Sequence, residues 1–249
     1  IDNNPGSQSF LQVIDLIHLA DSRYENAGNK AIPNHAYPHG MVFSKLTGKL
    51  YSLNNGYETV AVIDPVSHKI IDVFPMPKCS NLLLSPDGRY LIGKGADRKT
   101  DAQHVIGHIN VFDLKNMKSV AEMELLDIYP STYQFNREGK KLYVTTAYTG
   151  DAIQSKNLKT DQLLVFKADF PDIKLEKSIS VGQTRCKRRP FCICHDNNQS
   201  RFIFVPNMTD GTMSILDAST HETLVTPVVS TPGASDVTFS YWRNCFYGT

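Results

Sequence analysis

The chain has 249 residues, of which 41% are hydrophobic and 20% charged, and its formal net charge is +1. This length suits one large all-β domain or two small ones, and the composition is that of an ordinary globular protein. The near-zero charge argues against a nucleic acid partner, and no run of 18 apolar residues predicts a membrane span. Residue 1 is Ile rather than Met, so we expect a processed or partial chain.

An apolar strand that ends in an acidic residue, with a turn after it, recurs along the chain. The five copies read LQVIDL, VAVIDP, INVFDL, LLVFKA and MSILDA. Their equivalent positions are Asp15, Asp64, Asp113, Lys167 and Asp217, at steps of 49, 49, 54 and 50 residues. A period near 50 made of strands alone predicts stacked sheets of one design. We expect the aspartates to cap the turn that follows by accepting backbone N–H bonds.

Each repeat is interpreted as four strands. In the repeat at 36–78 the expected strands are 39–43, 50–53, 59–63 and 69–74. The repeat at 79–128 opens with LLLSPDGRYLIGKG, in which Pro-Asp-Gly is a strong turn signal between two apolar runs. The repeats at 129–183 and 184–232 share this pattern of strand, polar turn and strand. No segment predicts a helix of convincing length.

The two ends of the chain complement each other. Residues 233–249 supply the first two strands of a repeat, and residues 10–16 supply a third strand, so 233–249 with 1–35 would form a closing blade. The predicted fold class is therefore all-β, a single β-propeller domain of four-stranded blades over residues 1–249. It has five blades if the termini pair, and otherwise the chain is part of a six- to eight-bladed ring.

Two polar inserts lie between the second and third strands of their repeats, at 95–107 and 149–160. This connection lies on one face of a propeller, where binding loops tend to be built. The alternative interpretation is that both inserts are solvent-exposed loops without a binding role.

The segments LLLSPDGRYLIG, YQFNREGKKLYVTT and FIFVPNMTDGTMSILDASTHETL resemble the YVTN-type β-propeller repeat, and the resemblance covers nearly the whole chain. Proteins with this repeat include the cytochrome d1 propeller of nitrite reductase, the methylamine dehydrogenase heavy chain and the hydrazine synthase propeller subunits. Most of them work outside the cytoplasm. The resemblance implies an extracytoplasmic (periplasmic or secreted) binding or scaffold subunit, with a periplasmic redox complex as its setting and no cofactor of its own.

Two further segments are similar to the cytochrome d1-like group. They are NHAYPHGMVFS, at 34–44, and GADRKTDAQHVIGHINVFDL, at 95–114. This similarity implies an alternative function, an oxidoreductase propeller that binds haem d1 through a histidine of the central channel.

His35 and His39 lie at the entry to an innermost strand, which faces the channel of a propeller. An imidazole there would ligate a metal or haem, or act as an acid or base near neutral pH. In an extended segment the two residues lie about 13 Å apart, too far to share one metal ion. The alternative is a histidine that is hydrogen-bonded to loop backbone.

The run TRCKRRP is the one dense basic segment, and it precedes an innermost strand at the channel-mouth face. Arginine forks suit carboxylates and phosphates. We expect a small anionic ligand, or an acidic patch on a protein partner, to contact this segment through Arg185, Arg188 and Arg189. A solvated loop is the alternative.

Cysteine and histidine also occur together in CICH, which contains Cys192, Cys194 and His195. These residues are weak metal-site candidates, because cysteine is also a common small hydrophobe in buried strands. Cys186 would close a small loop with Cys192 in an oxidising compartment. His104 and His108 are interpreted as surface residues. No sequence motif of a known catalytic machinery is present.

Overall fold

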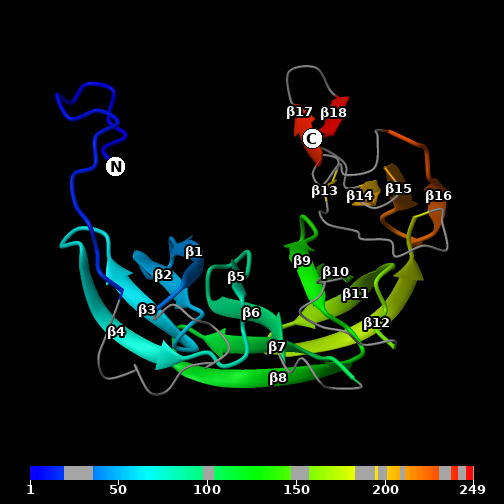
Figure 1. The fold of residues 1–249 in the computed structure, drawn as a ribbon, viewed down its shortest axis with the longest axis horizontal. Helices are drawn as coiled ribbons and strands as arrows, with labels where there is room; N and C mark the ends of the chain where they lie inside the picture. The colour runs from blue at the N-terminus through cyan, green and yellow to red at the C-terminus, as the bar shows by residue number, and fades with distance from the viewer. Residues whose placement is uncertain are drawn as a thin grey trace. The chain divides into compact units, whose positions relative to one another are not determined.

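The computed structural model describes residues 1–19, 36–97, 104–146, 157–182, 194–195, 201–207, 211–229, 237–240 and 245–248. All regular structure in these ranges is β-structure, and Figure 1 shows it as separate antiparallel sheets. Within the described residues there is consequently no helix of the length and apolarity that a membrane crossing requires. The chain divides into two compact units, Ile1–Leu82 and Leu83–Thr249.

The first unit contains one four-stranded sheet in the order β1-β2-β3-β4. Its strands are β1 (Pro38–Ser44), β2 (Lys49–Asn54), β3 (Thr59–Asp64) and β4 (Lys69–Pro75). All neighbours pair antiparallel. The four strands expected in this repeat are confirmed, with each bound within one residue of its expected place.

The second unit contains the remaining sheets, each again a run of consecutive antiparallel strands, apart from the first two residues of β5, which belong to the first unit. One sheet consists of β5 (Asn81–Leu84), β6 (Tyr90–Ala96), β7 (Ile106–Asp113) and β8 (Lys118–Leu126). The next consists of β9 (Pro130–Phe135), β10 (Lys141–Thr146), β11 (Gln162–Asp169) and β12 (Asp172–Ser180). A third consists of β13 (Cys194–His195), β14 (Phe202–Asn207), β15 (Thr212–Asp217) and β16 (Thr223–Val225), and a two-stranded sheet consists of β17 (Val237–Ser240) and β18 (Cys245–Gly248).

Strand β11 explains why the sheets of the second unit stack. Its side chains alternate between two apolar clusters, because successive residues of a strand point to opposite faces. Leu164 and Phe166 pack with residues of β6, β7 and β10, while Leu163 and Val165 pack with residues of β14 and β15. All four side chains are fully buried. A sheet that is apolar on both faces needs a neighbour on each side, which is the packing of a blade.

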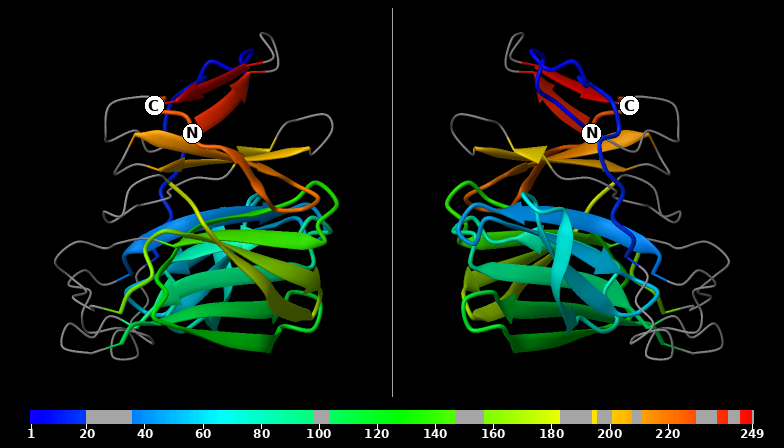
Figure 2. Two further views of the ribbon diagram at one scale, coloured as in Figure 1. Left: turned by 90° about the vertical axis from the view of Figure 1, so that its right-hand side faces the viewer. Right: turned by 90° about the vertical axis from the view of Figure 1, so that its left-hand side faces the viewer.

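The turns of these sheets lie at two opposite ends, because consecutive strands run antiparallel (Figure 2). The turns β5–β6, β7–β8, β9–β10 and β11–β12 are short and lie at what we call the hairpin end. At the opposite end, β6 and β10 end and β7 and β11 begin; we call it the insert end, because the two polar inserts lie between these strands in the sequence.

The strand expected at residues 10–16 is not formed. Residues 11–16 lie in no strand, and Phe10 forms an isolated bridge with Asp2. Asp15 accepts a bond from the adjacent N–H of Leu16 (2.7 Å) and lies 2.8 Å from Nδ1 of His68, so it does not cap a turn. A strand requires an edge that receives its N–H and C=O groups, and local bonds satisfy part of this segment instead. Closure of the ring and the number of blades remain predictions.

Candidate functional site

Aspartates cap the turn after the third strand in three sheets, as predicted. The Asp113 carboxylate accepts bonds from the N–H groups of Lys115 (2.8 Å) and Asn116 (3.3 Å). The carboxylate of Asp217 accepts bonds from the two equivalent N–H groups, and Asp64 accepts bonds from Val66 N–H (3.5 Å) and Ser67 Oγ (2.7 Å). These aspartates therefore have a structural role at the ends of strands.

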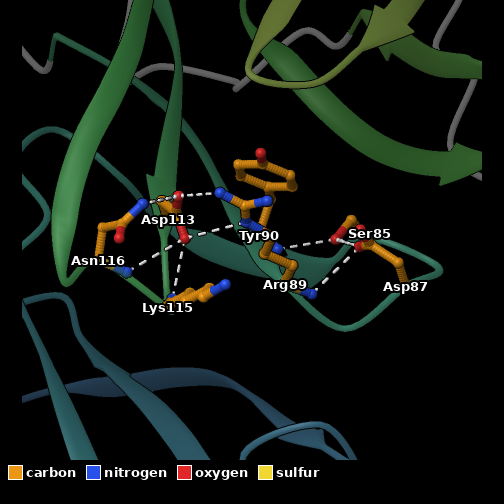
Figure 3. A network of polar contacts seen from close by, with 7 residues as sticks. All are labelled: Ser85, Asp87, Arg89, Tyr90, Asp113, Lys115 and Asn116. Atoms are coloured by element: carbon orange, nitrogen blue, oxygen red, sulfur yellow. Dashed lines mark hydrogen bonds and ion pairs between the residues drawn. The ribbon is translucent and has the colours of Figure 1, made fainter.

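Asp113 also anchors a second turn of its own sheet, as Figure 3 shows. The Arg89 guanidinium donates from Nη2 to Oδ2 of Asp113 (2.7 Å) and from Nε to Oδ1 (3.3 Å). Asp113 is almost fully buried, and the bond from Arg89 holds the pKa of its carboxyl well below the usual range. The same bond raises the pKa of Arg89. Lys49 and Asp64 form the equivalent ion pair in the first unit (3.0 Å).

The turn before β6 is held by its own polar side chains (Figure 3). Ser85 Oγ donates to Oδ1 of Asp87 (2.5 Å), which also accepts the N–H of Arg89 (3.1 Å). The N–H of Tyr90 donates to Ser85 Oγ (2.8 Å). The predicted turn at Pro86-Asp87-Gly88 is thus confirmed, with Gly88 at φ +74°.

A cavity of about 400 Å³ opens where this turn meets the turns of the next sheet. The lining comes from three turns of the hairpin end: Ser85, Pro86, Asp87, Arg89 and Tyr90, then Glu138 and Gly139, then Phe170. The turns are in close contact, since a Cβ atom on Gly139 would lie 2.7 Å from Cγ of Pro86. We call this cavity the hairpin-end pocket.

Aromatic rings form one wall of the hairpin-end pocket. The rings of Tyr90 and Phe170 stack, with centroids 5.0 Å apart and planes inclined by 18°. Phe135 packs edge-on against Phe170 (5.7 Å), and the guanidinium of Arg89 lies 4.9 Å from the Tyr90 ring centroid. Tyr90 is buried, and Phe170 is half-buried and lines the cavity. The arrangement offers an apolar platform next to charged groups, which suits binding.

His39 is one of the predicted site residues that the structure describes. It lies in β1, its side chain is exposed, and its Nδ1 lies 2.5 Å from the backbone carbonyl of Ser80. Hydrogen bonding to loop backbone, one of the two interpretations above, is therefore observed. The remaining predicted ligand-binding residues, His35, Arg185, Arg188 and Arg189, lie outside the described residues.

The CICH segment is described only in part. Cys194 and His195 form β13, the edge strand of its sheet that lies first in the chain, and Cys186 and Cys192 lie outside the described residues. Within the described ranges, no group of three or more His, Cys, Asp or Glu side chains is arranged to hold a metal ion.

The interpretation of His108 as a surface residue is wrong. His108 lies in β7 with 0% of its surface exposed, and its ring nitrogens are 3.5 Å from Asp97 and 3.8 Å from Glu122. The insert is shorter than the predicted range 95–107, because β7 begins at Ile106. His108 is therefore part of the sheet. His104 is half exposed and pairs with Asp127 (2.9 Å), in agreement with the expectation.

The pocket residues Arg89, Tyr90 and Phe170 were missed by the sequence analysis. A signal for Arg89 was present, because three repeats have a basic residue at the start of strand two and an aspartate at the end of strand three: Lys49 with Asp64, Arg89 with Asp113, and Arg201 with Asp217. Phe170 carries no comparable signal, because its partner Tyr90 lies in another sheet.

No family model matches the chain, and no curated protein matches it in sequence. Solved structures match in fold. The β-propeller domain of Cps50 (Swd1) from Myceliophteria thermophila has a TM-score of 0.58 and 14% identity, over 83% of this chain and 60% of that chain. A putative 6-phosphogluconolactonase from Bacteroides uniformis has a TM-score of 0.56 and 13% identity, over 89% of this chain and 61% of that one.

The third comparison is with the dihydro-heme d1 dehydrogenase NirN in complex with DHE, with a TM-score of 0.59 and 16% identity. It covers 79% of this chain and 39% of that chain. The chain thus spans less than two thirds of the length of each of these structures. At these identities the likeness concerns the fold alone. Together with the repeated four-stranded antiparallel sheets, it confirms that the chain has a blade-based β-propeller fold.

Proposed function

We propose that the chain is a propeller that binds a protein partner and acts as a binding or scaffold subunit. The observation that carries this proposal is the hairpin-end pocket, with its stacked Tyr90 and Phe170 rings beside Arg89. Aromatic and arginine side chains in such hollows are the residue types that dominate the binding energy of protein interfaces. A volume of about 400 Å³ lies near the lower end for ligand sites, and therefore suits a side chain of a partner better than a large cofactor.

The setting of this function is also a proposal, and the resemblance to the YVTN-type repeat supports it. We place the protein outside the cytoplasm, in the periplasm or secreted, as a subunit of a redox complex. A second contact, with a small anion or an acidic patch, is proposed for Arg185, Arg188 and Arg189 at the channel-mouth face.

Native mass spectrometry of the protein, isolated from the cells in which it is native, tests the binding function. We expect a complex with a second polypeptide, which Phe170→Ala weakens and Phe202→Ala leaves intact. Phe202 is the matched control, because it is also a half-buried aromatic residue but lies in the sheet of β14. A chain that occurs without any protein partner contradicts the proposal. Thermal unfolding of both variants shows that each is folded.

A second candidate function, the binding of haem d1, is supported by the geometry of His39. Because a carbonyl oxygen only accepts hydrogen bonds, the contact with Ser80 places the imidazole proton on Nδ1. The neutral ring then presents the lone pair of Nε2, which is how ligating histidines are commonly oriented. His39 would supply one ligand to the iron of haem d1, which would bring redox chemistry to the propeller.

The visible absorption spectrum of the purified protein distinguishes the two functions. A Soret or d1-type band that disappears in His39→Ala and persists in His104→Ala would establish the haem function. His104 is the matched control, because its side chain is also exposed but pairs with Asp127 instead of a backbone carbonyl. If the protein has no such band, or if His39→Ala retains it, the haem function through His39 is wrong.

A further inference from the structure

We propose that the hairpin-end pocket accepts the cationic side chain of a lysine or arginine from the protein partner. The inference rests on the proposed binding function and names the chemistry that the pocket selects. It is carried by the charges that line the pocket and by its aromatic wall.

The positive charge of the pocket is already neutralised. Arg89 makes two bonds to Asp113, a residue behind the lining, so its guanidinium is committed within its own sheet. These bonds and the contact with the Tyr90 ring hold the Arg89 side chain in place. Arg89 is therefore a structural part of the pocket wall. A charged ligand in the pocket would therefore interact mainly with the charged lining residues other than Arg89.

The other charged residues of the lining are Asp87 and Glu138. In each carboxylate, one oxygen already accepts a hydrogen bond from a neighbouring residue. Among the described residues, Ser85 Oγ and the N–H of Arg89 both donate to Oδ1 of Asp87, and Nδ2 of Asn136 donates to Oε2 of Glu138 (2.6 Å). Within this part of the chain, Oδ2 of Asp87 and Oε1 of Glu138 therefore remain as acceptors for a ligand. Both residues are exposed and lie on turns of two different sheets, at the rim of one cavity. A cation held between them gains charge-assisted bonds, while a phosphate or carboxylate would be repelled.

The aromatic wall suits the rest of such a side chain. Lysine and arginine carry an apolar stem, which packs against rings while the charged end stays at the rim. The pocket already contains a cation–aromatic contact, since the guanidinium carbon of Arg89 lies 4.9 Å from the centroid of the Tyr90 ring. The half-buried Phe170 ring, whose neighbours are Tyr90 and Phe135, offers the equivalent surface to an incoming cation.

The test uses three capped tripeptides, acetyl-Gly-Lys-Gly-amide, acetyl-Gly-Arg-Gly-amide and acetyl-Gly-Glu-Gly-amide, titrated into the ¹⁵N-labelled full chain. We expect the two cationic peptides to shift the amide signals of Gly88, Arg89 and Gly139, and the glutamate peptide to leave them unchanged. The double variant Asp87→Asn with Glu138→Gln retains the local hydrogen-bond acceptors and removes both charges. It should bind the cationic peptides about tenfold more weakly, as two partly exposed ion pairs imply.

The matched control is Asp72→Asn with Glu222→Gln, which removes two exposed carboxylates outside the pocket and should not alter binding. Equal shifts with all three peptides, no shifts with any of them, or unchanged affinity in the double variant would overturn the inference. If the peptides do not bind but the partner complex still depends on Phe170, the binding function stands and the cation preference is wrong. If the peptides bind but no partner complex exists, only the scaffold function is wrong.

Discussion

At the scale of single residues, Asp113 joins two turns of one sheet. Its carboxylate accepts bonds from the turn after β7 and from Arg89 of the turn before β6. Truncating a buried acceptor of this kind leaves several donors without a partner, which costs more than the net value of one bond. Asp113 therefore shapes the pocket, although it does not line it.

We expect Asp113→Ala to lower the free energy of unfolding by about 1–3 kcal/mol, because Arg89 and two backbone N–H groups lose their acceptor. Asp113→Asn keeps an acceptor and should lose less. Urea unfolding followed by circular dichroism measures both changes, with Asp172→Asn at an exposed position as the control. Equal stability of Asp113→Ala and the unmodified protein would show that the network contributes nothing.

The capping aspartates also predict a response to acid. The Ser67 hydroxyl, with Lys49, lowers the pKa of Asp64 to about 2, and hydrogen bonds from Ser219 and Thr220 lower that of Asp217 to about 2. Because these pKa values lie below the ordinary value of 3.8, the folded state releases protons more readily than the unfolded chain. Their contribution to stability is complete above about pH 4 and is lost as the pH falls toward 2.

Unfolding followed between neutral pH and pH 2 checks this prediction. Asp64→Asn and Asp217→Asn should each reduce the loss of stability over the acid range, since the replaced residue no longer takes up a proton. A pH dependence identical to that of the unmodified protein would contradict the assignment of these caps.

At the scale of elements, Gly139 permits the close contact of two turns. Its φ of +71° is unfavourable for other residues, and a Cβ atom there would lie 2.7 Å from Cγ of Pro86. Gly48 has a similar φ of +66° but nothing within 4 Å of such an atom. An alanine at position 48 would thus cost stability through its backbone conformation, whereas an alanine at position 139 would also clash with Pro86.

Replacing either glycine with alanine should cost roughly 1–2 kcal/mol for the backbone conformation. Gly139→Ala should cost clearly more than Gly48→Ala, and it should also weaken ligand binding at the hairpin-end pocket by moving the Pro86 turn. Thermal unfolding and the peptide titration measure the two effects. Equal destabilisation by the two variants would mean that the turns adapt without cost.

The sequence predicts features that are local, and it misses those that depend on packing. The Pro86-Asp87-Gly88 turn and the strands of the repeat at 36–78 follow from turn chemistry and from the period, and both are observed. The pocket depends on which turns of neighbouring sheets meet, and Tyr90 and Phe170 are 80 residues apart in the chain. Residues 10–16 have a strand-like pattern but form no strand, because a strand also needs the edge of a sheet with which its backbone can pair.

At the scale of the whole molecule, the sheets of the second unit depend on one another. Strand β11 directs Leu164 and Phe166 into one cluster, and Leu163 and Val165 into the other. Loss of either cluster leaves an apolar face of the same sheet in water. We infer that these sheets unfold together.

Leu163→Ala and Leu164→Ala test this cooperativity from the two faces of β11. Each should lower the free energy of unfolding by about 2–5 kcal/mol, as for fully buried leucines elsewhere. Both should shift one shared transition, and hydrogen exchange should speed up in β6–β7 and in β14–β15 for either variant. Faster exchange confined to the sheet nearest the substitution would show that the sheets unfold independently.

The division between the two ends of the sheets has a consequence for how this protein can vary. At the hairpin end, short capped turns such as 85–89 and 114–117 are fixed by hydrogen bonds, and the 85–89 turn is also in close contact with Gly139, so we expect extra residues there to disturb the neighbouring sheet. At the insert end, the connections 97–105 and 147–161 differ in length while the strands that they join keep their pairing. We therefore expect new sequence, whether acquired in evolution or grafted by design, to be tolerated better between these strands than in the hairpin-end turns.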